Sequence, residues 1–396
     1  MTDAATQFRS ELSAELENII GYWKNFSIDE ANGGFVGQRD YYNREILEAS
    51  KGIILNTRLL WTFSAVANHK KERSGELGSL ADRAYQYLKK AFKDDIFGGV
   101  FWEVDFRGNV INRRKQIYAQ AFTIYSLSEY YLLSEEKEAL EWALELFELI
   151  EKYAREWEFN GYLEAFQEDW SPIEDMRLSE KDKNSAKTMN THLHILEAYT
   201  TLYKVSKSEK VKAALENLTE LFLEKFYNPK IQHFQLFFDN EWNREGNLVS
   251  YGHDIETIWL MIEAAKASGN QDLIDRTKAI AVPVAKTFIE EGYIPGKGVI
   301  NEKDLDSGEV DTDRHWWQQA EAMVGLQYAY QISGEEKFRK VMLDIWKFTR
   351  KNMIDHENGE WFFRINENNL PYKQEDKLGM WKCPYHNSRA CMVLTQ

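Results

Sequence analysis

The chain is poor in residues that break helices or cross-link secreted proteins. Its 396 residues include 6 prolines and 2 cysteines, Cys383 and Cys391. Because an interior proline costs a helix about 3 kcal/mol, this scarcity leaves room for long helices. Two cysteines are too few for a disulfide framework. The composition therefore predicts a helical protein in a reducing compartment, and we expect it to be cytoplasmic.

Membrane-spanning and basic segments are also missing. No stretch approaches the roughly 18 uncharged apolar residues of a bilayer-spanning helix, and residues 1–16 lack the apolar core of a signal peptide. Acidic residues outnumber basic ones by 64 to 49, which gives a net charge of −15. This balance opposes binding to the phosphates of nucleic acid, which depends on Lys and Arg. We expect neither a membrane nor a nucleic-acid partner.

Helical periodicity runs through the chain in two alternating kinds of segment. One kind is apolar on nearly all sides, as in a helix that is buried on two faces. The expected buried helices are Ile53–Ala67, Ile117–Leu133, Met189–Tyr203, Ile255–Ala265, Ala320–Ile332 and Arg389–Leu394. The other kind has one apolar stripe, as in Glu136–Glu151, Ser208–Phe226, Leu273–Glu290 and Glu335–Met353. The alternation predicts two concentric helix rings, an all-α (α/α)6 barrel. Because no linker separates its repeated units, we expect residues 1–396 to form one domain, and the residues described below make it a candidate catalytic domain.

Short strand-like stretches beside Gly, Asn or Asp turn residues interrupt the helices. These stretches are Gly33–Asn43, Gly98–Asn109, His233–Asn243 and Gly359–Asn369. They predict short β-hairpins in the loops of the barrel. Loops at one end of a scaffold commonly form its binding site.

Six polar or aromatic anchor residues recur near the buried helices, at intervals of 59 to 76 residues. The anchors are Arg58, Tyr118, His194, His253, Trp317 and His386. A repeat of about 65 residues indicates an array of similar supersecondary units. Because the anchors share one phase of the repeat, we expect their side chains to meet at one end of the barrel.

Two anchor histidines precede a glutamate by three residues, namely His194 before Glu197 and His253 before Glu256. Residues three apart lie on one helix face, so each carboxylate can orient a ring for acid–base work near neutral pH. The alternative for each pair is a structural histidine held by a buried glutamate. We expect the third histidine, His386, in an exposed loop before the last helix.

A di-metal centre is the competing interpretation, because His and Glu three residues apart also bind metals in helix bundles. The other inward candidates, Arg58, Tyr118 and Trp317, are poor metal ligands, so we expect no metal and no cofactor. A guanidinium buried among apolar residues needs a partner or an anionic ligand. Together with the histidines, Arg58 suits proton abstraction next to a carbonyl, where it would balance the charge of an enediolate.

Five segments around the anchors form a specific combination: LNTRLLWTFSA, NTHLHILEAYT, SYGHDIETIW, HWWQQAEAMVG and WKCPYHNSRACM. They resemble the cellobiose 2-epimerase family, which belongs with the N-acylglucosamine 2-epimerases and the mannose isomerases. The resemblance extends from about Lys51 to Met392. It implies reversible epimerisation at C2 of the reducing-end glucose in β-1,4-linked disaccharides such as cellobiose, lactose and mannobiose. The implied route is ring opening and His-mediated proton transfer through an enediolate, in a monomer.

The resemblance also implies roles for individual residues. His253 and His386 are similar to the family's acid–base pair, and Arg58 is similar to the arginine that stabilises the enediolate. His194 and Glu256 match further catalytic positions. The positions that match substrate-binding residues are Tyr118, Asn190, Trp259, Trp316, Trp317, Glu321 and Trp381.

Other functions stay open at this point. Within the superfamily, the alternatives are a monosaccharide mannose isomerase or 2-epimerase and an N-acylglucosamine 2-epimerase. A glycoside hydrolase could use Glu256 and Glu321 as its two carboxyl groups, but it would leave His253 and His386 without a task. A non-catalytic sugar-binding protein is the last alternative, since a fold alone does not determine function.

Overall fold

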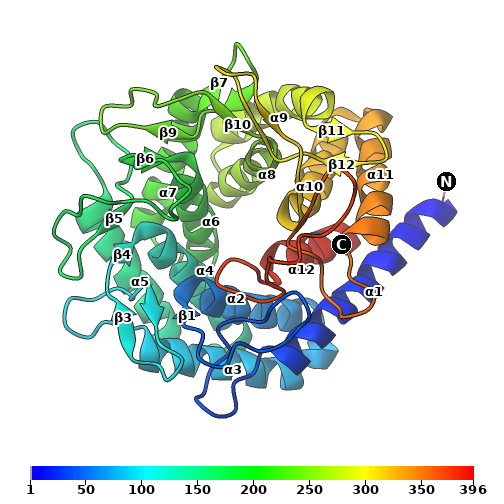
Figure 1. The fold of residues 1–396 in the computed structure, drawn as a ribbon. Coiled ribbons are helices and arrows are strands. Elements are labelled where there is room, and N and C mark those ends of the chain that lie inside the picture. Colours follow the sequence, from blue (N-terminus) through cyan, green and yellow to red (C-terminus); the bar gives the residue numbers. More distant parts are fainter. Residues whose placement is uncertain (1) are drawn as a thin grey trace.

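The computed structural model describes residues 2–396, and its α-helices form two rings. Figure 1 shows the inner helices around the barrel axis and the outer helices packed against them. The inner helices are α2 (Ile53–His69), α4 (Ile117–Ser134), α6 (Met189–Ser206), α8 (Tyr251–Ser268), α10 (Trp316–Ser333) and α12 (Tyr385–Thr395). The outer helices are α1 (Thr2–Phe26), α3 (Ser74–Ala91), α5 (Lys137–Leu149), α7 (Glu209–Leu221), α9 (Gln271–Glu291) and α11 (Glu336–Asn352). The predicted (α/α)6 barrel is confirmed.

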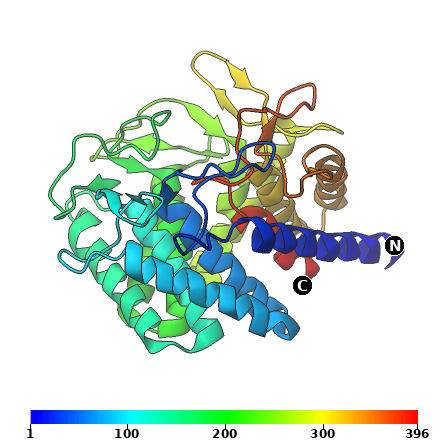
Figure 2. The same ribbon diagram turned by 60° about the horizontal axis from the view of Figure 1, so that its bottom comes forward.

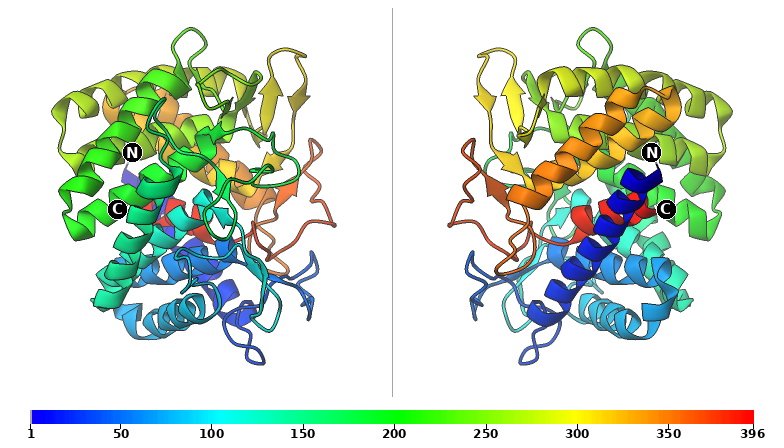
Figure 3. Two further views of the ribbon diagram at one scale, coloured as in Figure 1. Left: turned by 90° about the vertical axis from the view of Figure 1, so that its left-hand side faces the viewer. Right: turned by 90° about the vertical axis from the view of Figure 1, so that its right-hand side faces the viewer.

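Inner and outer helices alternate along the chain, and α12 closes the inner ring by contacting both α10 and α2. The N-terminal helix α1 packs against α12, so the two ends of the chain lie close together (Figure 3). A 3₁₀ turn at Lys71–Arg73 precedes α3. Single π-helical turns, Ile150–Ala154 and Phe222–Phe226, follow α5 and α7.

Burial explains why each helix lies in its ring. Every residue of α2 from Ile53 to Ala67 is buried, whereas the buried residues of α11 form one stripe that includes Phe338, Met342 and Ile345. An inner helix has neighbours on several sides, so it must be apolar nearly all round. The inner helices also pack closely, because a Cβ at Gly325 of α10 would collide with the Ile255 carbonyl oxygen of α8.

Short antiparallel strand pairs gather at the N-terminal ends of the inner helices (Figure 2). The strands are β1 (Lys51–Gly52), β2 (Glu103–Val104), β3 (Val110–Asn112), β4 (Lys115–Gln116), β5 (Ala165–Phe166), β6 (Lys187–Thr188), β7 (Tyr227–Asn228), β8 (His233–Phe234), β9 (Phe237–Phe238), β10 (Leu248–Ser250), β11 (Tyr293–Ile294), β12 (Gly298–Val299), β13 (Glu302–Asp304), β14 (Val310–Asp311), β15 (Arg314–His315) and β16 (Arg364–Ile365). Strands β1, β4, β6, β10 and β15 each run directly into an inner helix.

Local hairpins occur in the loops, as predicted, and the β2–β3 pair is one of them. The segment His233–Asn243 is different, because its two strands separate: β8 pairs with β7, and β9 pairs with β6. Likewise, β16 pairs with β15. Pairs such as β6–β9 and β15–β16 join strands from loops that are far apart in the sequence. These pairs connect adjacent units at this end of the barrel.

A buried ion pair of one kind recurs between units. The ammonium of Lys51 in β1 lies 2.7 Å from Asp29, and that of Lys115 in β4 lies 2.6 Å from Asp94. Each aspartate also accepts backbone N–H bonds within its own turn, after the preceding outer helix. Each pair thus ties an outer-helix turn to the strand that enters the next inner helix, and this holds the inner-helix N-termini at one end.

The helices described in residues 2–396 include none with the length and apolar character needed to cross a membrane.

Candidate active site

A cavity of about 500 Å³ opens at the N-terminal ends of the inner helices, and we call it the front cavity. All six anchor residues line it. Ten of the residues predicted for the site are among its lining: Arg58, Tyr118, Asn190, His194, His253, Glu256, Trp316, Trp317, Trp381 and His386. The repeat in the sequence therefore located the cavity correctly.

The polarity of the inner helices gives the front cavity its electrostatic character. Anchors such as Tyr118, His253, Trp317 and His386 lie in the first turn of their helices. The unpaired N–H groups of a helix N-terminus carry a partial positive charge. Several such termini converge on one cavity, so negative charge that develops there is stabilised.

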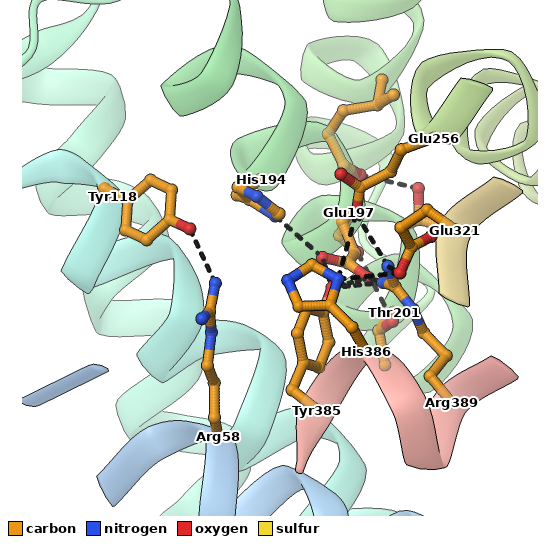
Figure 4. Close-up of polar contacts among 12 residues, drawn as sticks. Arg58, Tyr118, His194, Glu197, Thr201, Glu256, Glu321, Tyr385, His386 and Arg389 are labelled. Carbon is orange, nitrogen blue, oxygen red and sulfur yellow. Dashed lines mark hydrogen bonds and ion pairs between the residues drawn. The ribbon is translucent and has the colours of Figure 1, made fainter. Parts of the chain in front are cut away.

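His386 is held by a carboxylate. Its Nδ1 lies 2.7 Å from Glu321 Oε1, which leaves Nε2 as the nitrogen with a free lone pair (Figure 4). Burial, followed by the nearby charge of Arg58, lowers the pKa of His386 well below its usual value. The imidazole is therefore neutral at neutral pH and can accept a proton, and Glu321 would stabilise the resulting imidazolium.

The prediction that His386 lies in an exposed loop is wrong. The residue is the second of helix α12, which Pro384 caps, and its side chain is buried. Proline tolerates the first positions of a helix, because the N–H that it lacks would have no helical partner there. The Pro384 signal marked the start of a helix and not the end of a loop.

His253 is held differently, and its predicted pairing with Glu256 is wrong. Its Nδ1 lies 2.8 Å from the hydroxyl of Ser250, the N-cap of α8. Side chains of a helix lean toward its N-terminus, so a histidine in the first turn reaches the cap more readily than a residue one turn later. Burial lowers the pKa of His253 to about 3, and its ring centroid lies 4.8 Å from that of Trp317.

His194 follows the predicted pattern. Its Nδ1 lies 3.1 Å from Oε2 of Glu197, one turn further along α6. Burial lowers the pKa of this imidazole too. The ring meets the Tyr118 ring edge to face, with centroids 4.9 Å apart. The His-x-x-Glu pairing thus holds for His194, and this imidazole also begins in the neutral form.

Arg58 reaches the cavity without a carboxylate partner among the residues that the structure describes. One guanidinium nitrogen donates to the Tyr118 hydroxyl at 2.7 Å, and another lies 3.5 Å from the Cys383 sulfur. The guanidinium also lies over the Phe122 ring, 4.4 Å from its centroid. Because these partners leave its positive charge unneutralised, Arg58 can interact with negative charge on a ligand.

Arg389 is the main residue that sequence reasoning missed. One of its terminal nitrogens, Nη2, lies 2.7 Å from both Glu256 Oε1 and Glu321 Oε1, and the other bonds Glu197 and Tyr385 (Figure 4). One buried guanidinium therefore connects three carboxyl groups that come from three inner helices. A signal was present, because Arg389 follows His386 by three residues and so shares its helix face.

The three carboxyl groups differ in protonation. Burial alone would raise the pKa of Glu197, but the guanidinium of Arg389 lowers it to about 2. Burial, followed by repulsion from Glu321, raises the pKa of Glu256 well above its usual range. Glu321 accepts bonds from Arg389 and from the Trp259 indole nitrogen, at 3.1 Å for the indole. Burial also raises the pKa of Glu321, although the charge of Arg389 opposes the rise. The rise is larger for Glu256, which is therefore protonated before the Glu321 carboxylate that lies beside His386.

Two predicted substrate-binding residues, Glu321 and Trp259, are not part of the cavity lining. Both are buried behind His386, where the Trp259 indole supports the Glu321 carboxylate. Neither side chain lines the cavity, and their part in substrate binding stays a prediction. Both side chains point toward the barrel axis, as predicted. They lie one or more helical turns further from the cavity than the first-turn residues that line it.

A trio of possible metal ligands lies within this network. One ligand atom from each of Glu256, Glu321 and His386 falls within 4.8 Å of the others. The Arg389 guanidinium nitrogen, however, lies 2.7 Å from both carboxylate oxygens. A metal ion would have to displace a buried cation that already neutralises these oxygens, so the residues present fit the guanidinium better than a metal.

Aromatic rings and one free amide oxygen complete the front cavity. Trp317 lies between two catalytic candidates, with its ring centroid 4.8 Å from that of His253 and 5.6 Å from that of His386. Trp316 and Trp381 line other parts of the wall. The Oδ1 atom of Asn190 is buried without a hydrogen-bond partner among the described residues. Flat rings and unpaired polar atoms of this kind suit a sugar, which has apolar C–H faces and hydroxyl groups.

The front cavity continues into a second space of about 570 Å³. The two share lining residues, among them Asn190, His253 and His315. Part of the boundary comes from the loop before β6, where Leu178, Ser179, Lys181 and Asp182 line both spaces. The combined space can hold a ligand with more than one ring.

A helical barrel with neutral imidazoles and an unneutralised arginine at one end defines an enzyme of acid–base chemistry. The family model described as N-acylglucosamine 2-epimerase (GlcNAc 2-epimerase) matches residues 33–390. The chain belongs to this N-acylglucosamine 2-epimerase family.

Relatives within the family are similar over their whole length. The chain is 42% identical to a cellobiose 2-epimerase of Bacteroides fragilis over 98% of both chains. It is 39% identical to a cellobiose 2-epimerase of Dictyoglomus turgidum, covering 97% of each chain. Its structure matches that of a cellobiose 2-epimerase from Bacillus thermoamylovorans with a TM-score of 0.94 at 38% identity, covering 98% of this chain and 99% of the other. The resemblance seen in the sequence is confirmed.

Proposed function

We propose that this protein is a cellobiose 2-epimerase. It would interconvert glucose and mannose at the reducing end of β-1,4-linked disaccharides such as cellobiose, lactose and mannobiose. The observation that carries the proposal is the placement of two neutral imidazoles, His253 and His386, on the same Trp317 ring within the cavity that Arg58 lines. The full-length similarity to enzymes of that name supports it.

The proposed reaction begins with opening of the sugar ring, which exposes a carbonyl at C1. One imidazole, His253 or His386, removes the proton from C2, and the electron pair moves onto the carbonyl oxygen to give an enediolate. Arg58 and the helix N-termini stabilise this anion. The other imidazole takes up a proton from solvent and gives it to the opposite face of C2, which inverts that carbon and regenerates the aldehyde. The first imidazole then releases to solvent the proton that it removed.

Further residues would orient these groups. Glu321 holds His386 through Nδ1 and stabilises its charged form, and Ser250 holds His253. His194 and Tyr118 lie beside Arg58 on the same wall, where they can bind the oxygens of the open-chain sugar. The indole rings of Trp316, Trp317 and Trp381 would pack on the sugar faces. We propose that residues 1–396 act as one catalytic domain.

The disaccharide preference rests on the size of the site. The front cavity alone has about 500 Å³, and the space continuous with it adds about 570 Å³. The reducing-end sugar would lie at the histidines, and the second sugar would extend toward His315 and the loop that carries Lys181. Comparing turnover of cellobiose, D-mannose and N-acetylmannosamine tests this. A preference for either monosaccharide would contradict the disaccharide assignment.

The reaction itself is tested by incubating cellobiose with the purified protein in deuterated buffer. We expect glucosyl-mannose to accumulate, with deuterium at C2 of its mannose, because a proton bound to an imidazole exchanges with solvent. Release of free glucose would instead indicate hydrolysis. Binding without conversion or isotope exchange would indicate a sugar-binding protein.

We also propose that the enzyme is a metal-independent, cytoplasmic monomer without a cofactor. Arg389 already neutralises the carboxylates that a metal would need. Activity should therefore survive dialysis against EDTA, and loss that added divalent cations restore would contradict this. Size-exclusion chromatography with light scattering should give a mass near the 46.6 kDa of one chain.

A further inference from the structure

A second cavity, of about 460 Å³, lies at the opposite end of the barrel, and we call it the back cavity. It is surrounded by the C-terminal halves of all six inner helices. Its lining includes Asn68 of α2, Glu129 of α4, Lys204 of α6, Glu263 of α8, Tyr328 of α10 and Val393 of α12. None of these residues lines the front cavity.

The buried Arg389 network separates the two cavities. Arg389 and Glu197 line the back cavity, whereas Glu256, on the other side of the guanidinium, lines the front one. Figure 4 shows Thr201, another residue of the back lining, beneath this network. The back cavity is therefore a space of its own and not an extension of the substrate site.

Aromatic rings form much of the back wall, from Trp61, Tyr125, Trp259 and Tyr328. Trp61 and Tyr125 stack on each other, with centroids 5.3 Å apart and an interplanar angle of 17°. Internal cations already use the other two rings, because Arg389 lies 4.7 Å from the centroid of Trp259 and Lys266 lies 5.1 Å from that of Tyr328. Such rings attract cations and accept the C–H face of a sugar.

Glu129 is a carboxyl group of this cavity without a cation in direct contact among the described residues. Among the described residues, its side chain accepts a hydrogen bond from Asn68 at 2.7 Å, and no lysine or arginine forms an ion pair with it. By contrast, Glu263 has Lys266 at 3.0 Å and Lys204 at 3.9 Å. Burial raises the pKa of Glu129. The charge of Lys204 opposes this rise from a greater distance, and a ligand cation beside Glu129 would supply a direct partner.

The same lining also has N–H donors without an acceptor in the described part of the chain, and these would bind a ligand group other than the cation. The indole nitrogen of Trp61 and the Nε atom of Arg389 are buried without an acceptor among the described residues. Hydroxyl oxygens would satisfy them. The carbonyl ends of the inner helices also face this end of the barrel, and they carry a partial negative charge that favours a cation.

We infer that the back cavity is a second ligand site, for a small hydroxylated ammonium ion such as an amino sugar or an amino alcohol. The ammonium group binds the Glu129 carboxylate, hydroxyl oxygens accept from Trp61 and Arg389, and the carbon skeleton packs on the aromatic rings. A neutral polyol lacks the first interaction, and a simple inorganic cation lacks the other two. The inference does not depend on the proposed function, because it concerns other residues and binding alone.

Isothermal titration calorimetry with D-glucosamine, and with D-glucose as the neutral counterpart, tests the site. Glu129→Gln keeps the shape and removes the charge. Glu141→Gln, at an exposed position on the outer helix α5, is the matched control. We expect saturable glucosamine binding whose Kd rises about tenfold in Glu129→Gln, as for loss of one charged hydrogen bond, and does not change in Glu141→Gln. Binding of D-glucose should be insensitive to Glu129→Gln.

His386→Asn distinguishes the two cavities, because His386 lines the front cavity and does not line the back cavity. Glucosamine affinity that persists in His386→Asn and falls in Glu129→Gln supports the back site. Equal affinity in the wild type and Glu129→Gln, affinity lost only in His386→Asn, or the absence of saturable binding would each overturn the inference. Unchanged turnover of cellobiose by Glu129→Gln verifies that this variant is folded. If no form of the protein turns over cellobiose, the proposed function fails while the binding result stands.

Discussion

The two ends of the inner ring have opposite electrostatic character, although the same six helices form them. At the front, helix N-termini surround Arg58 and four imidazoles whose pKa values are lowered by burial, those of His194, His253, His315 and His386. At the back, helix C-termini surround the Glu129 and Glu263 carboxyl groups. Because inner helices that alternate with outer ones all run in one direction, their dipoles add at each end. The front thus favours an anion such as an enediolate, and the back favours a cation.

The Arg389 network, which lies between the two cavities, affects both ends of the barrel. Arg389 shapes the floor of the back cavity and orients Glu321, which holds His386 in the front cavity. Variants at the front, at the boundary and at the back should therefore differ in kind, and the following predictions test this from the largest expected effect to the smallest.

The largest effect should come from His386→Asn at the front. Without the imidazole, a proton cannot be taken up or returned at one face of C2, so kcat for cellobiose should fall about 10²- to 10⁴-fold. The same holds for His253→Asn. Deuterium exchange at C2 measures the loss in each direction. Near-normal exchange in either variant would remove that histidine from the proposed pair.

Arg389→Lys at the boundary should impair both ends. A lysine ammonium cannot bridge Glu197, Glu256 and Glu321 as the planar guanidinium does. With buried carboxylates left unpaired, the free energy of unfolding should fall by about 3–5 kcal/mol, and kcat by about 100-fold through the loss of His386 positioning. Urea denaturation and steady-state kinetics measure these changes.

The matched control for Arg389→Lys is Arg276→Lys on the outer helix α9, where the arginine pairs with Glu220 near the surface. That change should cost less than about 1 kcal/mol. Equal stability losses in the two variants would mean that the buried network does not depend on the guanidinium fork.

Stability should also decrease as the pH falls, because of the front histidines. The pKa of His253 is about 3 in the folded protein and about 6.5 when unfolded. The unfolded chain therefore binds more protons between these values, and the stabilising contribution, complete above pH 6.5, is lost as the pH falls toward 3. Urea denaturation between pH 7 and pH 5 should show this slope, and His253→Asn should reduce it.

His233 supplies a control of opposite sign. Burial would lower its pKa, but the bond to Asp254 at 2.6 Å raises it above the usual value. Its contribution is therefore present below pH 6.5 and is lost as the pH rises through the folded pKa. His233→Asn should make the free energy of unfolding depend more steeply on pH. His253→Asn should make that dependence shallower. Slopes that shift alike in both variants would contradict these protonation states.

The smallest effect should come from Lys204→Gln at the back. This lysine is half exposed, and its ion pair with Glu263 spans 3.9 Å. Surface pairs of this kind contribute at most about 1 kcal/mol, and kcat should not change. A clear drop in kcat would show that the two ends are coupled more strongly than the Arg389 network suggests.

Much of this architecture could be predicted from the sequence, because it depends on local patterns. Helix position, ring membership and the front location of the anchors all follow from which residues are apolar along a helix. Inner helices Ile117–Leu133 and Met189–Tyr203 match α4 and α6 to within a few residues at each end. The His194–Glu197 pair also follows, since both residues lie on one helix face.

What the sequence could not show is which side chains from different helices meet. Glu256 is three residues from His253, yet it bonds Arg389, 133 positions along the chain. His386 finds Glu321, 65 positions earlier, and Arg58 finds Tyr118 in the next unit. Spacing along one helix identifies the residues that share a face. It does not show which neighbouring helix has a side chain at the same level along the barrel axis.

The sequence by itself therefore determined the barrel, the end at which the chemistry lies and most of the side chains there, since each follows from a periodic or repeated pattern. The tertiary structure alone decided how those side chains are protonated and held. Closure of the ring brings α6, α8, α10 and α12 together at the axis, where one guanidinium meets three carboxyl groups away from water. Burial and cross-helix distance set their charges, and neither quantity can be read along a single chain.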